Sequence, residues 1–275
     1  MHGFLRSAQR GFTLIEMVTV VVIMGIVIFS VGSIIRAGGD IYADTVKTEN
    51  ILGEGRFVLA RMTREVRDAV PNSVRVKTGS NWQCLEFLPI LSKGRYLSLP
   101  IYPAATSIGG TVIMPSGSLS QGEIMWVNPV SVSTVYSVNG SNGVNRAVID
   151  TSTAGSDANT FDITFSGGPL RFSSESPRQR FYVAKTPVSY CYEETKGEVR
   201  RYASYALSEN QLEPTQMGAS ALMAQLLVND VSASSIFTVV SAGTAGNALI
   251  TMKPEFSISG QNFTFHHQVS IANVP

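Results

Sequence analysis

The sequence is poor in the residues that most enzymes use for catalysis and metal binding. It has three histidines among 275 residues, one near the start (His2) and an adjacent pair, His266 and His267. Neighbouring side chains of a strand point to opposite faces, so these two histidines cannot readily bind the same metal ion. We expect them to lie on the surface or to pack within a strand. We find no Walker loop, no dinucleotide-binding fingerprint and no nucleophile elbow before a helix. The sequence therefore predicts a protein that is not an enzyme.

Charge is also scarce. Charged residues make up 15% of the chain, and the formal net charge is +1, which gives no electrostatic footprint for nucleic acid. Three aspartates of expected loops, Asp150, Asp157 and Asp162, are candidate Ca²⁺ ligands, but their spacing matches no defined calcium loop. We favour solvated loop charges, expect no cofactor, and keep Ca²⁺ as the alternative.

One apolar run stands out against this background. Within residues 12–35 the only charged side chain is Glu16. More than twenty residues at about 1.5 Å each can cross a bilayer core of roughly 30 Å as a helix. A carboxylate inside such a segment costs about 2.5–3.5 kcal/mol and needs a partner. Arg6 and Arg10 precede the run without any acidic residue, which places the N-terminus in the cytoplasm.

The helical period continues beyond residue 35, since no proline occurs before Pro71. Gly38 and Gly39 form a weak point and the expected hinge. Further on, residues that share or border one stripe are Ile51, Val58, Leu59, Met62, Glu65, Val66, Ala69 and Val70. This pattern predicts one helix of nearly sixty residues, from Phe12 to about Ala69, whose first half lies in lipid and whose second half packs on a sheet.

Past Pro71 the chain changes to short β-like runs separated by Gly, Ser, Asn and Pro. Predicted strands are 74–77, 83–88, 123–127, 131–138, 147–150, 160–165, 180–184, 188–193, 199–205, 237–240, 248–252, 256–259 and 263–272. Their alternation favours antiparallel pairing, two Asn-Gly dipeptides in 137–144 predict tight turns, and a short helix is expected over 220–229. The predicted fold is α+β, with a long N-terminal helix packed on one sizeable β-rich head.

The run from Arg10 through Gly11, Phe12 and Thr13 to Glu16 resembles the N-terminal signature of type IV pilins and type II secretion pseudopilins. The resemblance implies that a prepilin peptidase cuts between Gly11 and Phe12 and methylates the new N-terminus. Glycine suits that position because an extended backbone without a side chain can approach a protease closely. The cationic amine of Phe12 would then meet the Glu16 carboxylate of a neighbouring subunit and set the stagger between chains. The alternative is an ordinary signal-anchor that tolerates one Glu.

The resemblance divides the chain into a leader (1–11), a transmembrane and assembly helix (12–35), an amphipathic periplasmic part of the helix (36–70) and a β-rich periplasmic domain (71–275). It implies a single-pass protein of the bacterial inner membrane, with a cytoplasmic N-terminus before processing and incorporation into a surface pilus. The implied partners are the prepilin peptidase, other major and minor pilins, the inner-membrane assembly platform and membrane lipid.

Residues 56–73 resemble minor pilins and minor pseudopilins of the MshO, PilW and GspJ kinds, and looser matches near Tyr190 and His266 are closest to the MshO type of the MSHA pilus. We therefore expect a minor pilin that joins or primes an MSHA-type pilus. The alternatives are a minor pseudopilin of a type II secretion tip complex and a tethered periplasmic binding protein or adhesin.

Cys84 and Cys191, the two cysteines of the chain, both lie beyond the membrane segment. An even pair in an oxidising compartment predicts a disulfide. The alternative is two buried free thiols. A zinc site is not supported, since neither cysteine lies in a Cys-x-x-Cys pair or has a nearby histidine.

Overall fold

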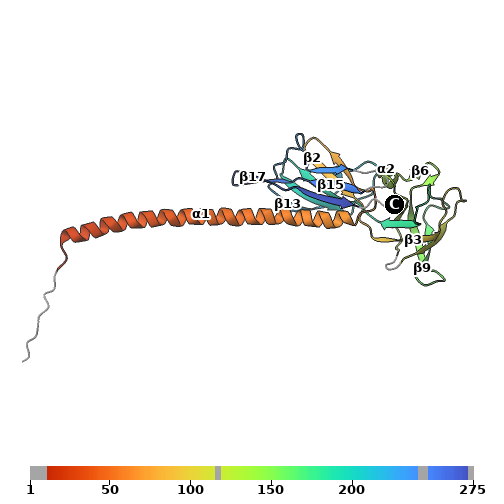
Figure 1. The fold of residues 1–275 in the computed structure, drawn as a ribbon, viewed down its shortest axis with the longest axis horizontal. Coiled ribbons are helices and arrows are strands. Elements are labelled where there is room, and N and C mark those ends of the chain that lie inside the picture. Colours follow the sequence, from red (N-terminus) through yellow and green to blue (C-terminus); the bar gives the residue numbers. More distant parts are fainter. Residues whose placement is uncertain (1–10, 115–118, 241–246, 272–275) are drawn as a thin grey trace, which may run out of the picture. The chain divides into compact units, whose positions relative to one another are not determined.

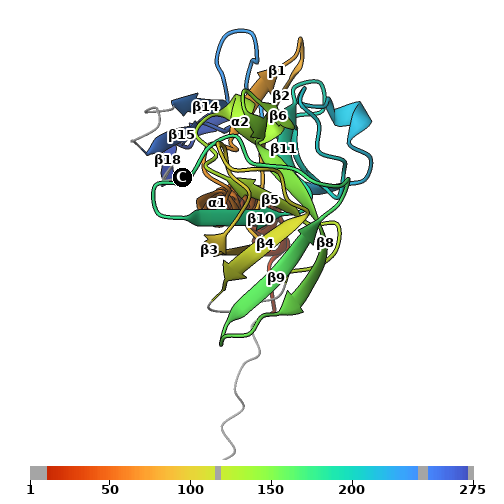
Figure 2. The ribbon, with the colours of Figure 1, turned by 90° about the vertical axis from the view of Figure 1, so that its right-hand side faces the viewer.

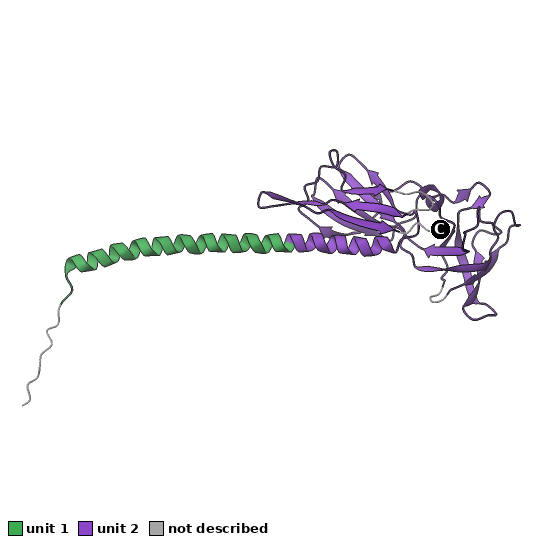
Figure 3. Ribbon diagram, viewed as in Figure 1, with its two compact units in different colours: residues 1–50 green, residues 51–275 purple. Residues whose placement is uncertain are grey.

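The computed structural model describes residues 11–114, 119–240 and 247–271. It confirms the predicted α+β class, a long N-terminal helix followed by antiparallel strands (Figure 1). The chain divides into two compact units, Met1–Asn50 and Ile51–Pro275 (Figure 3).

The helix α1 runs from Leu14 to Arg67, within two residues of the predicted ends. It continues through Gly38 and Gly39, where an added Cβ would meet nothing within 4 Å. The glycine pair therefore does not interrupt the helix, and its role as a hinge stays a prediction. The buried positions of α1 begin at Ile51, whereas residues 36–50 are exposed apart from a half-buried Thr48.

The C-terminal part of α1 docks on the head through the predicted stripe. Apart from Glu65, every residue predicted on or beside this stripe is buried. Glu65 is half-buried and accepts from Arg61 Nε at 2.9 Å and from Arg201 Nε at 3.0 Å. Burial alone would raise the pKa of Glu65, but the two arginines outweigh it and leave that pKa lowered. The carboxylate thus stays ionised where the helix meets the sheet.

The helix packs on a five-stranded antiparallel sheet of order β1-β2-β11-β12-β13. Its strands are β1 (Arg75–Thr78), β2 (Trp82–Phe87), β11 (Val188–Glu193), β12 (Glu198–Ala203) and β13 (Ser220–Ala224). Leu85, Phe87 and Tyr190 of the sheet share one core with Val58 and Met62 of the helix.

A closed six-stranded barrel is inserted between β2 and β11, in the order β10-β3-β4-β9-β8-β5 (Figure 2). Its strands are β3 (Ser92–Ser98), β4 (Gly109–Ile113), β5 (Ile124–Val127), β8 (Arg146–Ala154), β9 (Thr160–Phe165) and β10 (Arg180–Ala184). The barrel has a separate core that includes Met125, Ile149, Phe172 and Phe181. The head therefore holds two main cores, where the sequence predicted one.

The other elements are short. A three-stranded sheet joins β14 (Phe237–Val240), β15 (Ala248–Met252) and β18 (His267–Ile271), and β16 (Glu255–Ile258) pairs with β17 (Gln261–Thr264). The predicted turn region contains the hairpin β6 (Asn139–Gly140) and β7 (Gly143–Val144), and a 3-10 turn spans Pro214–Gln216.

The structure corrects several predicted elements. Residues 131–138 form no strand but contain the helix α2 (Val132–Tyr136), because Ser131 and Thr134 form a capping box. The helix expected over 220–229 is instead strand β13, which pairs with the edge of β12. The run expected at 263–272 ends one strand at Thr264 and begins the next at His267; residue 272 lies outside the described residues. Strands β3 and β4 were not predicted.

Gly55 marks a close approach of α1 to the head. A Cβ at this position would lie 3.0 Å from the ring of Phe256 and 3.2 Å from that of Phe265. We expect Gly55→Leu to lower the free energy of unfolding by about 1–3 kcal/mol, because the side chain would overpack this contact. The matched control is Gly53→Leu, since an added Cβ there meets nothing within 4 Å. Denaturant titration of both variants checks this, and an equal loss in both would contradict it.

Candidate assembly site

The segment that carries the predicted processing and assembly residues begins just before α1. Thr13 is the N-cap: Glu16 N donates to Thr13 Oγ1 at 3.3 Å, and Met17 N donates to the Thr13 carbonyl at 3.3 Å. Glu16 is therefore the third helical residue, where the positive end of the helix dipole stabilises a negative charge. Our sequence reading missed this cap, although Thr-x-x-Glu is the spacing of a capping box.

Gly11 and Phe12 precede the helix in neither helix nor strand, and both are exposed. The peptide bond between them therefore lies in a segment that an enzyme can reach. While Gly11 is attached, the Phe12 nitrogen is an uncharged amide, so the predicted cation arises only on cleavage. The leader residues Arg6 and Arg10 lie outside the described residues.

The apolar side chains of the first half of α1 are uncovered within this chain. All of residues 12–35 are exposed except a half-buried Gly32, with Phe12 at 79% and Phe29 at 74%. The helix is long and apolar enough to cross a membrane, with a mean hydropathy of 2.7 over its most apolar window and none of that window buried. Such a surface needs lipid or other helices to cover it.

The hydroxyl groups of this segment are satisfied by the helix itself. Thr19, Ser30 and Ser33 each donate to a backbone carbonyl three or four residues earlier, at 2.8–3.0 Å. The Glu16 carboxylate has no hydrogen bond or ion pair within the described part of the chain. It is thus the single polar side chain of residues 12–35 that has no partner among the described residues.

The two cysteines lie opposite each other on neighbouring strands, Cys84 on β2 and Cys191 on β11. They form a disulfide with an S–S distance of 2.07 Å, and both residues are fully buried. The two joined strands are those between which the barrel is inserted. The bridge therefore closes the base of the insertion. Because it is buried, it is a structural disulfide rather than an exposed, reactive one.

His267 begins β18, where its Nε2 lies 2.8 Å from Thr63 Oγ1 of α1, while His266 is exposed. Asp150 accepts from Gln121 Nε2 at 3.0 Å, and Asp162 accepts from Thr111 Oγ1 at 2.7 Å. Among the residues that the structure describes, no three His, Cys, Asp or Glu side chains gather as metal ligands.

Comparison with known proteins adds one finding. Residues 6–32 match the family model of the prokaryotic N-terminal methylation motif. No curated protein and no solved structure matches the chain. The match supports a type IV pilin-like or pseudopilin-like protein that a prepilin peptidase processes and that assembles with other pilins. With the apolar helix, it supports a single-pass membrane anchor, and proteins of this type are structural subunits rather than enzymes.

Proposed function

We propose that this chain is a minor pilin that is cut between Gly11 and Phe12, methylated at Phe12 and incorporated into an MSHA-type pilus, or primes its assembly. The observation that carries the proposal is the lone Glu16 carboxylate in residues 12–35, where the hydroxyl groups of Thr19, Ser30 and Ser33 are satisfied by the helix itself. The N-cap accounts for backbone groups of the first turn but leaves both carboxylate oxygens without a partner among the described residues.

A charge at this position requires a compensating interaction. A carboxylate in the apolar core costs about 2.5–3.5 kcal/mol on insertion scales. The cleaved chain supplies one cation at a similar depth in the membrane, the Phe12 amine, which lies four residues before Glu16. On a neighbouring subunit, that amine satisfies the carboxylate and fixes the axial stagger of the two helices, which is the best-attested use of a buried polar pair.

The similarity of the segments near Tyr190 and His266 to MshO-type minor pilins favours the pilus over the main alternative, a minor pseudopilin of a type II secretion tip complex. Residues 56–73 resemble both kinds of subunit. The inserted barrel adds a second core beyond the sheet on which α1 packs, which suits a specialised minor subunit better than a repeated one. Co-purification separates the alternatives, because MSHA subunits support the first and secretion-channel components the second.

Processing is tested by mass spectrometry of the chain from cells with and without the prepilin peptidase. We expect a mature chain that begins at N-methylated Phe12, and an intact chain when the peptidase is absent. A Gly11→Val variant should stay uncut, because its branched side chain hinders the approach of the protease. An intact N-terminus in peptidase-positive cells would refute this part of the proposal.

The role of Glu16 is tested by Glu16→Ala. We expect cleavage and membrane insertion to persist while incorporation into pili falls by at least about tenfold, because one buried partner of the ion pair is lost. Glu49→Ala is the matched control, since Glu49 lies exposed on the same helix beyond the membrane segment. Sheared pili are compared with membrane fractions by immunoblot. Equal incorporation of both variants would leave only a tethered periplasmic module.

A further inference from the structure

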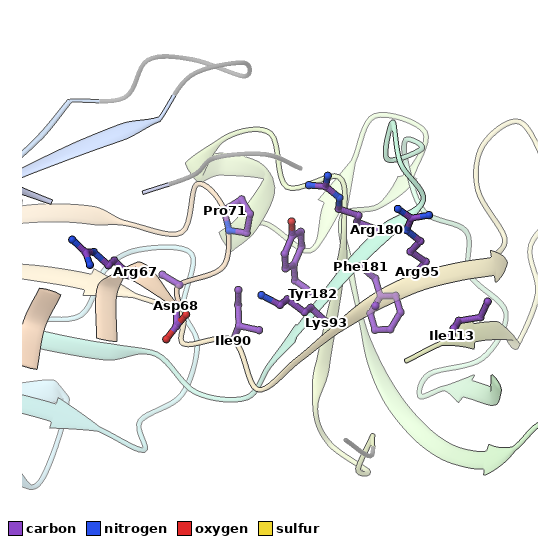
Figure 4. A pocket seen from close by; sticks show the side chains of 12 residues that line it. Arg67, Asp68, Pro71, Ile90, Lys93, Arg95, Ile113, Arg180, Phe181 and Tyr182 are labelled. Carbon is purple, nitrogen blue, oxygen red and sulfur yellow. The ribbon is translucent and has the colours of Figure 1, made fainter. Parts of the chain in front are cut away.

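A cavity of about 610 Å³ lies where the end of α1 and the following segment meet the wall of the barrel (Figure 4). Arg67, Asp68 and Pro71 line one side, and residues of β3, β4 and β10 line the other. Its volume is within the range of about 300–1,000 Å³ typical of small-molecule sites. Nothing in the predicted assembly role uses this cavity.

Cations gather along its barrel wall. Lys93 and Arg95 are two residues apart on β3 and therefore share one face. Arg180 of β10 is the register partner of Arg95, so two like charges lie directly opposite each other, an arrangement that destabilises a sheet. Arg67 contributes a fourth cation, and Asp68 is the one acid among the described lining residues.

Three of these cations have no partner. Within the described residues, the side chains of Arg67, Lys93 and Arg95 form no hydrogen bond and no ion pair, and all three are exposed. Some other cations of the same unit are paired, such as Arg75 with Glu86 and Arg201 with Glu65. At the cavity, three of the four cations are uncompensated within the described residues and lie around one space, in a chain whose net charge is only +1.

The cavity also has an apolar surface. Ile90 and Ile113 line it, together with Phe181, whose ring lies behind Gly94. A Cβ at Gly94 would lie 2.8 Å from that ring and 2.3 Å from the Ile113 carbonyl oxygen, so only glycine fits between them. Because the Phe181 ring is fully buried, Ile90 and Ile113 supply the exposed apolar surface beside the cations, which suits an organic ligand better than a bare inorganic ion.

From this arrangement we propose that the cavity binds a small organic anion with two acid groups on a compact body. Arg95 and Arg180 hold one acid group and thereby relieve their mutual repulsion. Lys93 and Arg67 hold the other, and the body lies against Ile90 and Ile113. Asp68 on the rim selects against ligands whose charge extends past Arg67.

The test uses the full chain in detergent micelles and fructose 1,6-bisphosphate as the probe, with binding measured by calorimetry. We expect saturable binding at one site, weakened by about tenfold or more in Arg95→Ala and in Lys93→Ala, because each removes a charge-assisted contact. Arg178→Ala is the matched control: it removes the same charge from an exposed position that does not line the cavity, and binding should change by less than about twofold.

Thermal melts establish that each variant folds before binding is compared. If Arg178→Ala weakens binding as much as Arg95→Ala does, the ligand responds to net charge rather than to the cavity, and the proposal is overturned. Absence of saturable binding would overturn it as well. If inorganic phosphate binds as tightly as the bisphosphate, the ligand needs no organic body with two acid groups, which contradicts the proposal. If glucose binds as tightly, the site does not select for an anion, which also contradicts it. None of these outcomes depends on cleavage at Gly11 or on Glu16, so they leave the pilin assignment standing.

Discussion

Replacement of Arg75 by methionine is expected to lower the free energy of unfolding by about 3–5 kcal/mol, because it leaves Glu86 as a buried charge without its counter-ion. The side chain of Glu86 is 1% exposed. Arg75 Nη2 lies 2.6 Å from Glu86 Oε1, and its Nε donates to the same oxygen at 2.9 Å. The second oxygen accepts from the Tyr205 hydroxyl at 3.0 Å.

This buried pair also connects the sheet to the helix α2, which lies between β5 and β8 in the inserted segment. The Arg75 guanidinium lies 3.5 Å from the centre of the Tyr136 ring in α2, and the Tyr136 hydroxyl donates to the Ser73 carbonyl at 2.7 Å. Burial and the nearby Glu86 raise the pKa of Tyr205 far above its usual value, so that hydroxyl remains a donor. Loss of Arg75 therefore removes the ion pair and a contact between the sheet and α2.

Denaturant titration measures the effect, with Lys77→Met as the matched control. Lys77 lies on the same strand, but its ion pair with Glu213 is 3.6 Å long and both side chains are 40% exposed or more, so its loss should cost less than about 1 kcal/mol. The double variant Arg75→Met/Glu86→Leu should be more stable than Arg75→Met alone, since it removes the unpaired charge. A double variant as unstable as the single one would show that the other contacts of Arg75, which include hydrogen bonds to the Ser208 and Glu209 carbonyls, carry the effect rather than charge pairing.

The long helix and several of the strands follow from local sequence pattern. The stripe from Ile51 to Val70 repeats with the helical period, and each apolar member is buried. Strands β9, β10, β11, β14 and β15 have the predicted bounds. The first four are rich in β-branched or aromatic residues, and β15 is a short apolar run.

The closure of the barrel was not predictable in this way, although four of its strands, β5, β8, β9 and β10, overlap predicted runs. Strand β3 contains Lys93, Gly94 and Arg95, a poor β-forming sequence, and it pairs with β10, which lies more than eighty residues later. Closure of the barrel supplies hydrogen-bond partners on both edges of β3, and this tertiary context outweighs its low local preference. The cavity escaped prediction for the same reason, since Arg95 and Arg180 meet only through that register.

The Glu16 site, unlike the barrel, could be predicted largely from the sequence. The cost of one acid in an apolar run is visible in the sequence, and the structure adds that the neighbouring hydroxyls are satisfied within the helix. The partner itself is absent from both, because it is expected on another protomer. The N-cap at Thr13 was also visible in the sequence as Thr-x-x-Glu, but the apolar run drew the interpretation to the membrane segment instead.

Removal of the disulfide is expected to have an effect as large as that of Arg75→Met. Cys84 and Cys191 are 107 residues apart, and a loop of that length corresponds to about 5 kcal/mol of unfolded-state entropy at 25 °C. The variant Cys84→Ala/Cys191→Ala should therefore lose several kcal/mol of stability. The barrel lies inside this loop, so the loosened base of β2 and β11 should speed amide exchange in the barrel as well as in the sheet.

Denaturant titration with and without reductant separates the bridge from the packing of its sulfurs. Reductant should lower the midpoint of the unaltered chain toward that of the double-alanine variant and leave the variant unchanged. Non-reducing peptide mapping should recover the two cysteine peptides joined. Two free thiols in chain purified from membranes without reductant would contradict the bridge. An unchanged midpoint after its reduction would mean that the ladder between β2 and β11, together with the buried residues around it, already restrains the insertion without a covalent link.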